Sequence, residues 1–299
     1  MPRFTLRQLE HFRAVAEARS FSAAAESLML SPSAVSASIT ELERSLGTQL
    51  FVRKKAQGVT VTSAGTYLLD EARDLLRRAD ELQIGVEGDS GKLSGPIRIG
   101  CYSTLSATVL PRLIDDFSAQ HPEVSITFVD GSMPELEPLL AAGQLDFIIT
   151  YRINLPPRLT EVVLYRNEVN VLLPADHRLA DADSIALSDM ADEPLIMLDV
   201  PPSGRHTLDM LQAAGIHPEV RYTTTNFELV RSMVGRGLGY TLLMQKPVVN
   251  VSYEGLPLVA KRIEGHVSDE FAVIVWASTV RLTERAATLV RFAQESFAH

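Results

Sequence analysis

Apolar residues near the N-terminus recur three and four positions apart, which is the spacing of one face of a helix. These residues are Leu6, Leu9, Phe12, Val15 and Ala16. Thr5 and Gln8 stand before them as a capping box, in which each side chain satisfies a free backbone amide of the first turn. Arg19 and Ser20 break the pattern, so we expect the first helix to end there.

Two more helices are predicted before the next break. Ser22 is a suitable N-cap for a short helix over 23–28. Ser31, followed by Pro32 at the first helical position, is expected to cap a third helix that ends at Gly47. Its inward-facing residues are predicted to be Val35, Ile39, Leu42 and Leu46. A short helix, a tight turn and a longer helix together indicate a helix-turn-helix.

The outer face of the third helix carries small and hydroxyl side chains, which can approach base edges and thymine methyl groups. They are Ser33, Ser36, Ala37 and Thr40. Residues 50–53 and 59–61 are predicted to form a hairpin, on which Arg53, Lys54 and Lys55 can meet DNA phosphates. The same pattern also fits a small helical cap domain with a solvated basic loop. DNA binding by this head, residues 1–62, is therefore a hypothesis at this point.

Six apolar residues beyond the hairpin are spaced alternately by four and three positions, as in a heptad seam. They are Leu68, Ala72, Leu75, Ala79, Leu82 and Val86. We predict a linker helix over 63–88 that pairs two copies of the chain, and a hinge over 89–95, which is rich in turn residues. A helix packed on its own domain has a similar stripe, so the alternative stays open. Pairing suits the head, because two recognition helices then reach two half-sites about one turn of DNA apart.

The body of the chain, residues 96–299, alternates predicted strands and helices, which is an α/β pattern. Strands are predicted at 97–101, 124–129, 145–150, 168–173, 194–198, 219–223, 240–244 and 270–277. Helices are predicted after the first strand as far as Gln120, and at 135–142, 206–214, 226–236 and 280–297.

Polar residues of the body lie where ligands bind in α/β folds, beyond strand ends and at helix starts. The set comprises Ser103, Thr104, Ser132, Met133, Ser203, Gly204, Arg205, His206 and Asn226. Each position also fits a helix cap, and the set forms a pocket only if the side chains converge on one cleft. In that case Arg205 or His206 would supply charge for a small polar or anionic metabolite.

The net charge of −9 is unevenly distributed. Residues 1–66 hold eight basic and five acidic residues, a net charge of +3, whereas the remainder has a net charge of −12. A basic head on an acidic body fits a DNA-binding module joined to another domain. A solute-binding transport protein is disfavoured by this head and by the lack of a signal peptide, and we expect a cytoplasmic protein that does not enter membranes.

An enzyme with an appended regulatory head is disfavoured because the sequence has no Gly-x-Ser-x-Gly elbow, phosphate-binding loop or His-Glu-x-x-His motif. We therefore expect no catalytic residues, no metal and no cofactor. Cys101 is the only cysteine, so no intrachain disulfide can form. We interpret it as a small buried hydrophobic residue, with a redox or covalent sensor as the alternative.

A further set of residues matches one family across the head at continuous spacing. The set is Leu9, Phe12, Ser20, Phe21, Ser22, Ala24, Ala25, Leu28, Ser31, Ser33, Ala34, Val35, Ser36, Ile39, Leu42, Glu43, Leu46, Gly47, Leu50, Phe51, Arg53, Thr60, Thr62, Ala64 and Gly65. In these residues the head closely resembles LysR-type transcriptional regulators. The resemblance implies that Ser33, Ser36 and Ser38 lie in the recognition helix and that Arg53 is the wing arginine. Ala37 and Thr40 replace the basic or amide residues of many relatives, so DNA shape is expected to contribute to specificity.

The body is similar to the effector domain of the same family in looser motifs. They contain Leu110, Pro111, Leu113, Phe117, His121, Pro122, Gly143, Leu145, Asp146, Gly237, Gly239 and Tyr240. This implies a fold like that of periplasmic binding proteins, with one subdomain over 96–166 and 268–299, a second over 167–267, and a small-molecule effector between them. It adds Tyr151 to the polar positions given above as effector contacts.

The resemblance also implies partners and a mode of control. The expected partners are double-stranded DNA, a second copy of the chain in a homodimer or homotetramer, and RNA polymerase. The peroxide-sensing branch of the family uses a cysteine pair, which Cys101 alone cannot reproduce.

Overall fold

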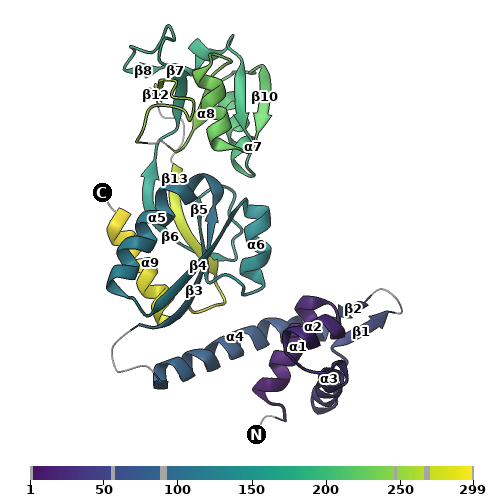
Figure 1. Cartoon of the computed structure of the whole chain (residues 1–299). Coiled ribbons are helices and arrows are strands. Elements are labelled where there is room, and N and C mark those ends of the chain that lie inside the picture. The colour runs from purple at the N-terminus through teal and green to yellow at the C-terminus, as the bar shows by residue number, and fades with distance from the viewer. Residues whose placement is uncertain (1–2, 55–57, 88–92, 246–247, 266–269, 298–299) are drawn as a thin grey trace. The chain divides into compact units, whose positions relative to one another are not determined.

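The computed structural model describes residues 3–54, 58–87, 93–245, 248–265 and 270–297 (Figure 1). The chain divides into two compact units, Met1–Gly91 and Lys92–His299. Each unit is described by itself below.

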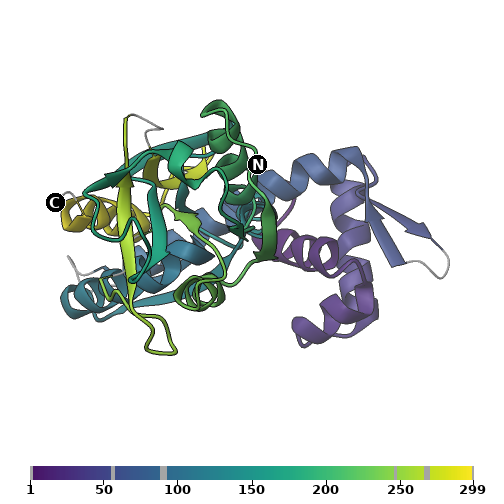
Figure 2. The same cartoon turned by 90° about the horizontal axis from the view of Figure 1, so that it is seen from above.

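The first unit is a three-helix head with a hairpin and a long helix. Its elements are α1 Leu6–Ala18, α2 Phe21–Ser27, α3 Pro32–Leu46, β1 Phe51–Lys54, β2 Gly58–Val61 and α4 Ser63–Glu87. The capping box before α1 is present, since Gln8 N donates to Thr5 Oγ1 over 3.2 Å and Thr5 N donates to Gln8 Oε1 over 2.8 Å. The two strands pair antiparallel and extend away from the helices (Figure 2).

The helix-turn-helix begins two residues earlier than predicted. Ser20, and not Ser22, caps α2: it has an extended backbone, and its Oγ accepts from Ala23 N over 3.3 Å. Ser31 caps α3 as expected, with its Oγ accepting from Ala34 N over 3.2 Å. Gly47 ends α3 in the left-handed region at φ 69°, a conformation that favours glycine.

A single core holds the head together. Its most buried side chains are Leu9, Phe12, Val15, Ala24, Val35, Ile39, Leu42 and Leu50, joined by Ala72 and Leu76 from α4. The prediction for Leu46 is wrong: it occupies the last position of α3 and is 36% exposed, because the core ends one turn before it.

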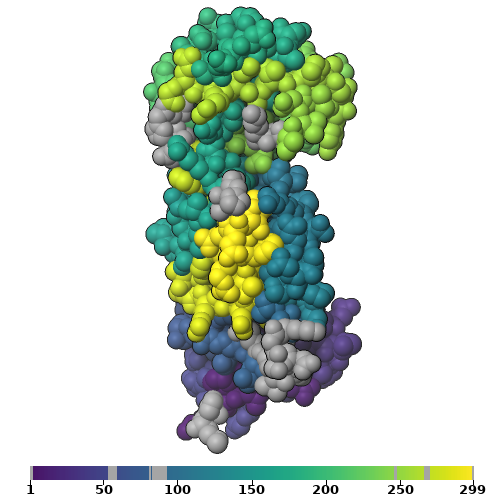
Figure 3. Space-filling model, turned by 90° about the vertical axis from the view of Figure 1, so that its left-hand side faces the viewer, coloured from purple at the N-terminus to yellow at the C-terminus, as the bar shows by residue number. Residues whose placement is uncertain are grey.

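The second unit contains two α/β subdomains. Subdomain I has the sheet order β4-β3-β5-β13-β6. Its elements are β3 Gly95–Tyr102, α5 Ser103–Gln120, β4 Val124–Gly131, α6 Met133–Ala141, β5 Phe147–Tyr151, β6 Leu159–Asn167, β13 Glu270–Ala277 and α9 Glu284–Phe297. Strands β3, β4 and β5 are parallel, and β13 runs antiparallel to β5 and β6. Helices α5 and α9 lie side by side on one face (Figure 3). The rings of Phe117 on α5 and Phe292 on α9 are 5.5 Å apart.

Subdomain II lies between β6 and β13 in the sequence. It has a four-stranded sheet of order β11-β7-β12-β8 and a parallel pair, β9 and β10. Its elements are β7 Asn170–Pro174, β8 Ser184–Ile185, the 3-10 helix Leu187–Met190, β9 Leu195–Leu198, α7 Ser203–Ala213, β10 Val220–Thr224, α8 Phe227–Gly235, β11 Thr241–Leu243 and β12 Leu258–Ile263. The chain enters this subdomain after β6 and returns to subdomain I at β13, so residues far apart in sequence meet where the two subdomains join.

Three strands among the described residues of the body escaped the sequence analysis, and these are β6, β8 and β12; β8 is only two residues long. Strand β6 is the edge of its sheet and remains half exposed, so it lacks the continuous apolar run that marked β5. Strand β12 carries Lys261 and Arg262 in succession, on opposite faces, so it has neither a continuous apolar run nor a regular alternation of apolar and polar residues.

Candidate nucleic-acid interface and ligand pocket

Helix α3 presents the predicted base-reading residues on one side. Ser33, Ala37 and Thr40 are exposed, and Ser36 is half-buried. Positions 33, 36, 37 and 40 follow one another at helical spacing, so they share a face that can enter a groove. None of the four carries a charge, which leaves this face to hydroxyl and methyl contacts.

Two of the predicted serines have structural partners. Ser38 is half-buried, and its Oγ lies 2.8 Å from Nδ1 of His11 on α1. Burial, followed by the charge of Arg7, lowers the pKa of His11, so the ring is neutral at physiological pH. The Oγ of Ser31 caps α3 and lies 3.0 Å from the Oγ of Ser33.

The wing is the β1–β2 hairpin. Arg53 pairs with Val59, and Lys54 pairs with Gly58 at the end of the ladder. The third predicted phosphate contact, Lys55, lies outside the described residues. The hairpin therefore carries two of the three basic positions next to the helix-turn-helix.

The predicted dimer seam on α4 has two environments. Ala72 is buried in the core of the head, and Leu68 packs against that core. Leu75 is 42% exposed and Leu82 is 73% exposed. Ala79 is half-buried, and Val86 lies in the last turn of the helix. Pairing of two chains along α4 stays a prediction, with its exposed part at Leu75 and Leu82.

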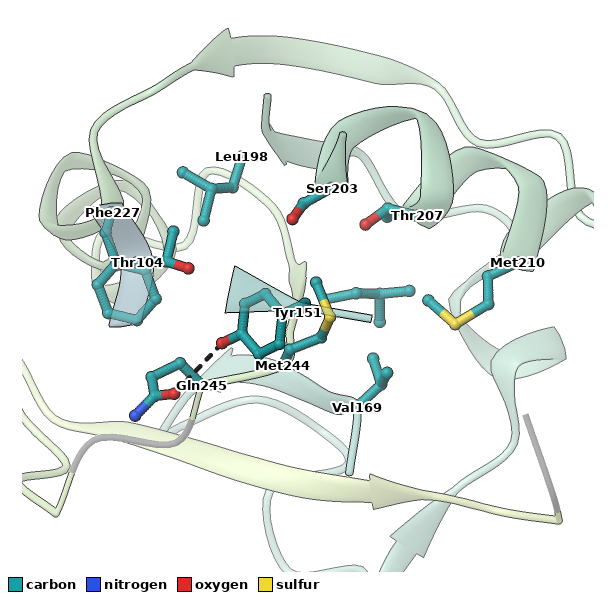
Figure 4. Close-up of a pocket in the computed structure, with 11 residues that line it drawn as sticks. Thr104, Tyr151, Val169, Leu198, Ser203, Thr207, Met210, Phe227, Met244 and Gln245 are labelled. Carbon is teal, nitrogen blue, oxygen red and sulfur yellow. Dashed lines mark hydrogen bonds between the residues drawn. The ribbon is translucent and has the colours of Figure 1, made fainter. Parts of the chain in front are cut away.

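A pocket lies between the two subdomains of the second unit (Figure 4). Residues from both subdomains line it: Thr104, Tyr151, Val169, Leu198, Ser203, Thr207, Met210, Phe227, Leu242, Met244 and Gln245. The free space is about 20 Å³, which is room for a single water molecule. Thr104, Tyr151 and Ser203, three of the predicted contacts, therefore meet at one place although they come from three separate segments.

Hydrogen bonds cross between the subdomains next to this pocket. The hydroxyl of Tyr102, at the end of β3, donates to Val200 O over 2.6 Å and lies 2.7 Å from Ser203 Oγ. The hydroxyl of Tyr151 donates to Gln245 Oε1 over 3.3 Å, and Gln245 Nε2 donates to Thr108 Oγ1 over 2.7 Å. Burial raises the pKa of Tyr102 to about 12. Its hydroxyl therefore stays protonated at physiological pH and can donate.

A half-buried histidine–glutamate pair adds another connection between the subdomains. His206 on α7 lies with its Nε2 2.6 Å from Oε1 of Glu270, the first residue of β13. Glu270 is 2% exposed. The hydrogen bond to Glu270 is the main cause that raises the pKa of His206.

The other predicted contacts do not line the pocket. Ser132 is held by Glu135 in a capping box, with its Oγ donating to Oε2 over 2.6 Å, and Met133 is buried in the core of subdomain I. Asn226 caps α8 by accepting from two backbone amides, each over 3.0 Å. Ser132 and Asn226 therefore act as helix caps in the structure, and Met133 acts as a core residue.

The remaining predicted positions lie close to the pocket without entering its lining. Ser103 is the first residue of α5, one position before Thr104. Arg205 is exposed and pairs with Asp209 over 2.8 Å. Gly204 packs so closely on Asp199 that a Cβ would collide with it, which explains the glycine.

The sequence analysis missed all six apolar residues of the lining and the two polar residues Thr207 and Gln245. Thr207 is four positions after Ser203 on the same helix, so helical spacing was a usable signal. Gln245 follows β11 closely, and the rule about strand ends applied to it as well.

A wider cavity of about 690 Å³ adjoins the pocket and shares Met244 and Gln245 with it. Its basic residues include Arg112, whose guanidinium lies over the ring of Phe297, and Arg262, which pairs with Glu168 over 3.0 Å. Within the described ranges there is no cluster of residues that could hold a metal ion. The same residues include no helix long and apolar enough to cross a membrane.

Two family models match the chain. Residues 6–66 match the bacterial regulatory helix-turn-helix protein of the lysR family, and residues 90–298 match the LysR substrate binding domain. The chain belongs to the LysR family of bacterial transcription regulators. The family and the fold class expected from the sequence are thereby confirmed, and so is the expectation of a regulator rather than an enzyme.

Individual relatives support this assignment. The LysR-family chain is 30% identical over 253 residues to the hydrogen peroxide-inducible genes activator of Pectobacterium carotovorum, covering 83% of this chain and 82% of the relative. The C-terminal domain of a probable LysR family transcriptional regulator from Rhodococcus sp. RHA1 is 41% identical, with a TM-score of 0.65, and covers 67% of this chain and 99% of that chain. HinK, a LysR family regulator from Pseudomonas aeruginosa, is 30% identical, with a TM-score of 0.67, and covers 98% of this chain and 99% of that chain.

Proposed function

We propose that this LysR-family regulator binds operator DNA through α3 and the wing, as a homodimer or homotetramer, and that a small molecule bound between its two subdomains controls it. The main support is the convergence of Thr104, Tyr151 and Ser203 in one pocket whose walls come from both subdomains. A ligand in such a position contacts both subdomains, so it favours the arrangement in which they are closed.

The change in closure is proposed to alter how the copies of the chain assemble, and therefore how their heads are spaced on DNA. RNA polymerase is the proposed further partner, and the cytoplasm, where the operator lies, is the proposed location. The sign of regulation follows from whether the closed or the open assembly fits the operator.

Peroxide is the alternative signal that the relative from Pectobacterium suggests. A redox-sensing cysteine needs an accessible thiolate. Cys101 is fully buried, it is the only cysteine, and burial raises the pKa of its thiol far above the ordinary value. We therefore propose that ligand binding, and not oxidation of a cysteine pair, is the trigger in this chain.

The experiment is a titration of the full-length chain against labelled DNA from upstream of its own gene, beside an unrelated fragment of equal length at the same salt concentration. Specific binding should be about 10³-fold tighter or more than binding to the unrelated fragment. Ala37→Glu places a negative charge on the exposed face of α3 and should remove this preference. Ala18→Glu, on an exposed position at the end of α1, is the matched control. Equal affinity for both fragments would contradict sequence-specific regulation.

A further inference from the structure

We propose that the pocket takes an uncharged, mainly apolar molecule with a single hydrogen-bonding group, which the hydroxyl of Thr207 recognises. The proposal rests on the proposed function, since it names the class of effector for the same pocket. It departs from the expectation of an anionic or polar metabolite.

The first observation is the composition of the pocket lining. Six of the eleven residues are apolar, and these are Val169, Leu198, Met210, Phe227, Leu242 and Met244. The other five are uncharged: Thr104, Tyr151, Ser203, Thr207 and Gln245. A carboxylate buried here would find no cationic side chain in exchange for its hydration, only hydroxyls and the backbone amides at the starts of α5 and α7, so its burial is less favourable than that of an uncharged molecule.

The second observation is that basic side chains of the nearby helices are paired away from the pocket. Arg205 is exposed and bound to Asp209, and His206 is bound to Glu270. Arg231 on α8 is buried, but it pairs with Glu228 over 2.8 Å and donates to two backbone carbonyls of residues 249 and 251. The two residues expected to supply charge, Arg205 and His206, therefore have other partners.

The third observation concerns the hydroxyl and amide groups in the lining. Ser203 is paired with Tyr102, and Gln245 is held between Tyr151 and Thr108. Thr207 differs from these residues: it lines the free space, is 8% exposed, and takes part in none of the side-chain hydrogen bonds formed among the described residues. This hydroxyl is directed toward the centre of the pocket (Figure 4). The hydroxyl oxygen borders the free space and is not sealed inside the protein, so a ligand that fills this space must offer it one polar atom in place of water.

The fourth observation is the size and adaptability of the pocket. Its free space of about 20 Å³ is too small for a ring, so the walls must move when a ligand enters. Met210 and Met244 face this space, and methionine side chains rearrange easily (Figure 4). Met244 and Gln245 also line the neighbouring cavity of about 690 Å³. Movement of these two side chains would join the spaces and admit a compact ring.

The test uses two ring-matched pairs of probes on the full-length chain: benzyl alcohol with benzoate, and cyclohexylmethanol with cyclohexanecarboxylate. Dissociation constants are measured by calorimetry at pH 7. Each alcohol is expected to bind at least tenfold tighter than its carboxylate. Equal or tighter binding of the carboxylates, or no binding by either alcohol at millimolar concentration, would overturn the assignment.

A variant links the binding to the proposed hydroxyl. Thr207→Val keeps the shape of the side chain but removes the hydrogen bond, and it should weaken binding of the alcohols about fivefold. Thr223→Val, on the exposed side of β10, is the matched control and should leave binding unchanged. Unchanged binding in Thr207→Val would refute the role of Thr207.

The effector role is tested separately from the ligand class. Operator affinity is measured with and without saturating benzyl alcohol. If the alcohol binds through Thr207 but operator affinity does not change, the ligand class stands and control by the pocket fails. If operator affinity responds only to the carboxylates, the proposed function stands and the ligand class fails.

Discussion

Removal of the Tyr102 hydroxyl should destabilise the contact between the two subdomains. In Tyr102→Phe the ring is kept, but Val200 O loses a donor at 2.6 Å and Ser203 Oγ loses a partner at 2.7 Å. Val200 and Ser203 are 4% and 5% exposed, so water does not readily replace the lost hydroxyl. Each net hydrogen bond contributes about 1 kcal/mol, and the unpaired groups add a desolvation cost, so the free energy of unfolding should fall by about 2–3 kcal/mol.

The assay is urea unfolding of the full-length chain. Trp276 is the only tryptophan and lies in β13, so its fluorescence reports on subdomain I. Tyr222→Phe removes a hydroxyl from a residue that is 40% exposed on β10, and it should change the free energy of unfolding by less than about 0.5 kcal/mol. If Tyr102→Phe behaves like this control, the hydrogen bonds of Tyr102 do not stabilise the closed arrangement.

Three further predictions concern other parts of the chain. Glu270 raises the pKa of His206, so the pair stabilises the folded chain fully below the unfolded pKa of 6.5, and this stabilisation is lost as the pH rises through the folded pKa. His206→Gln should therefore lower the free energy of unfolding more at about pH 6 than at about pH 8.5. An equal loss at both pH values would contradict a stabilising pair. Arg53→Ala should weaken operator binding and reduce the slope of log affinity against log salt by about one, whereas an unchanged slope would remove Arg53 from the phosphate contacts. Leu82→Glu, at a position of α4 that is 73% exposed, should shift the chain toward monomers in analytical ultracentrifugation, and an unchanged mass distribution would place the dimer contact elsewhere.

The sequence was most informative where local chemistry decides the structure. The cap at Thr5, the Ser31-Pro32 start and the Gly47 stop depend on residues a few positions apart, and all three are present. Ser20 and Ser22 both suit the role of N-cap locally. Phe21 packs against the core of the head, and this contact favours the earlier start, so Ser20 caps α2.

The pocket was only partly predictable, because its members come from segments distant in sequence. Polar residues after strands were a valid signal for Thr104 and Ser203, whereas Tyr151 was expected only from the family resemblance. The same signal applied to Ser132 and Asn226, whose side chains are used as helix caps. Distance from a strand end does not distinguish a hydroxyl that caps a helix from one that faces a cavity.

The position of the pocket explains how one ligand can act on the whole second unit. A ligand shifts an equilibrium only by its difference in affinity for the two states. Thr104 and Tyr151 belong to subdomain I, whereas Thr207 and Met244 belong to subdomain II, so a bound molecule gains its full set of contacts only when the subdomains are closed. Each 1.4 kcal/mol of this difference changes the ratio of closed to open molecules about tenfold. The Tyr102 hydroxyl favours the same closed state, so Tyr102→Phe should weaken the binding of a pocket ligand even though Tyr102 does not line the pocket.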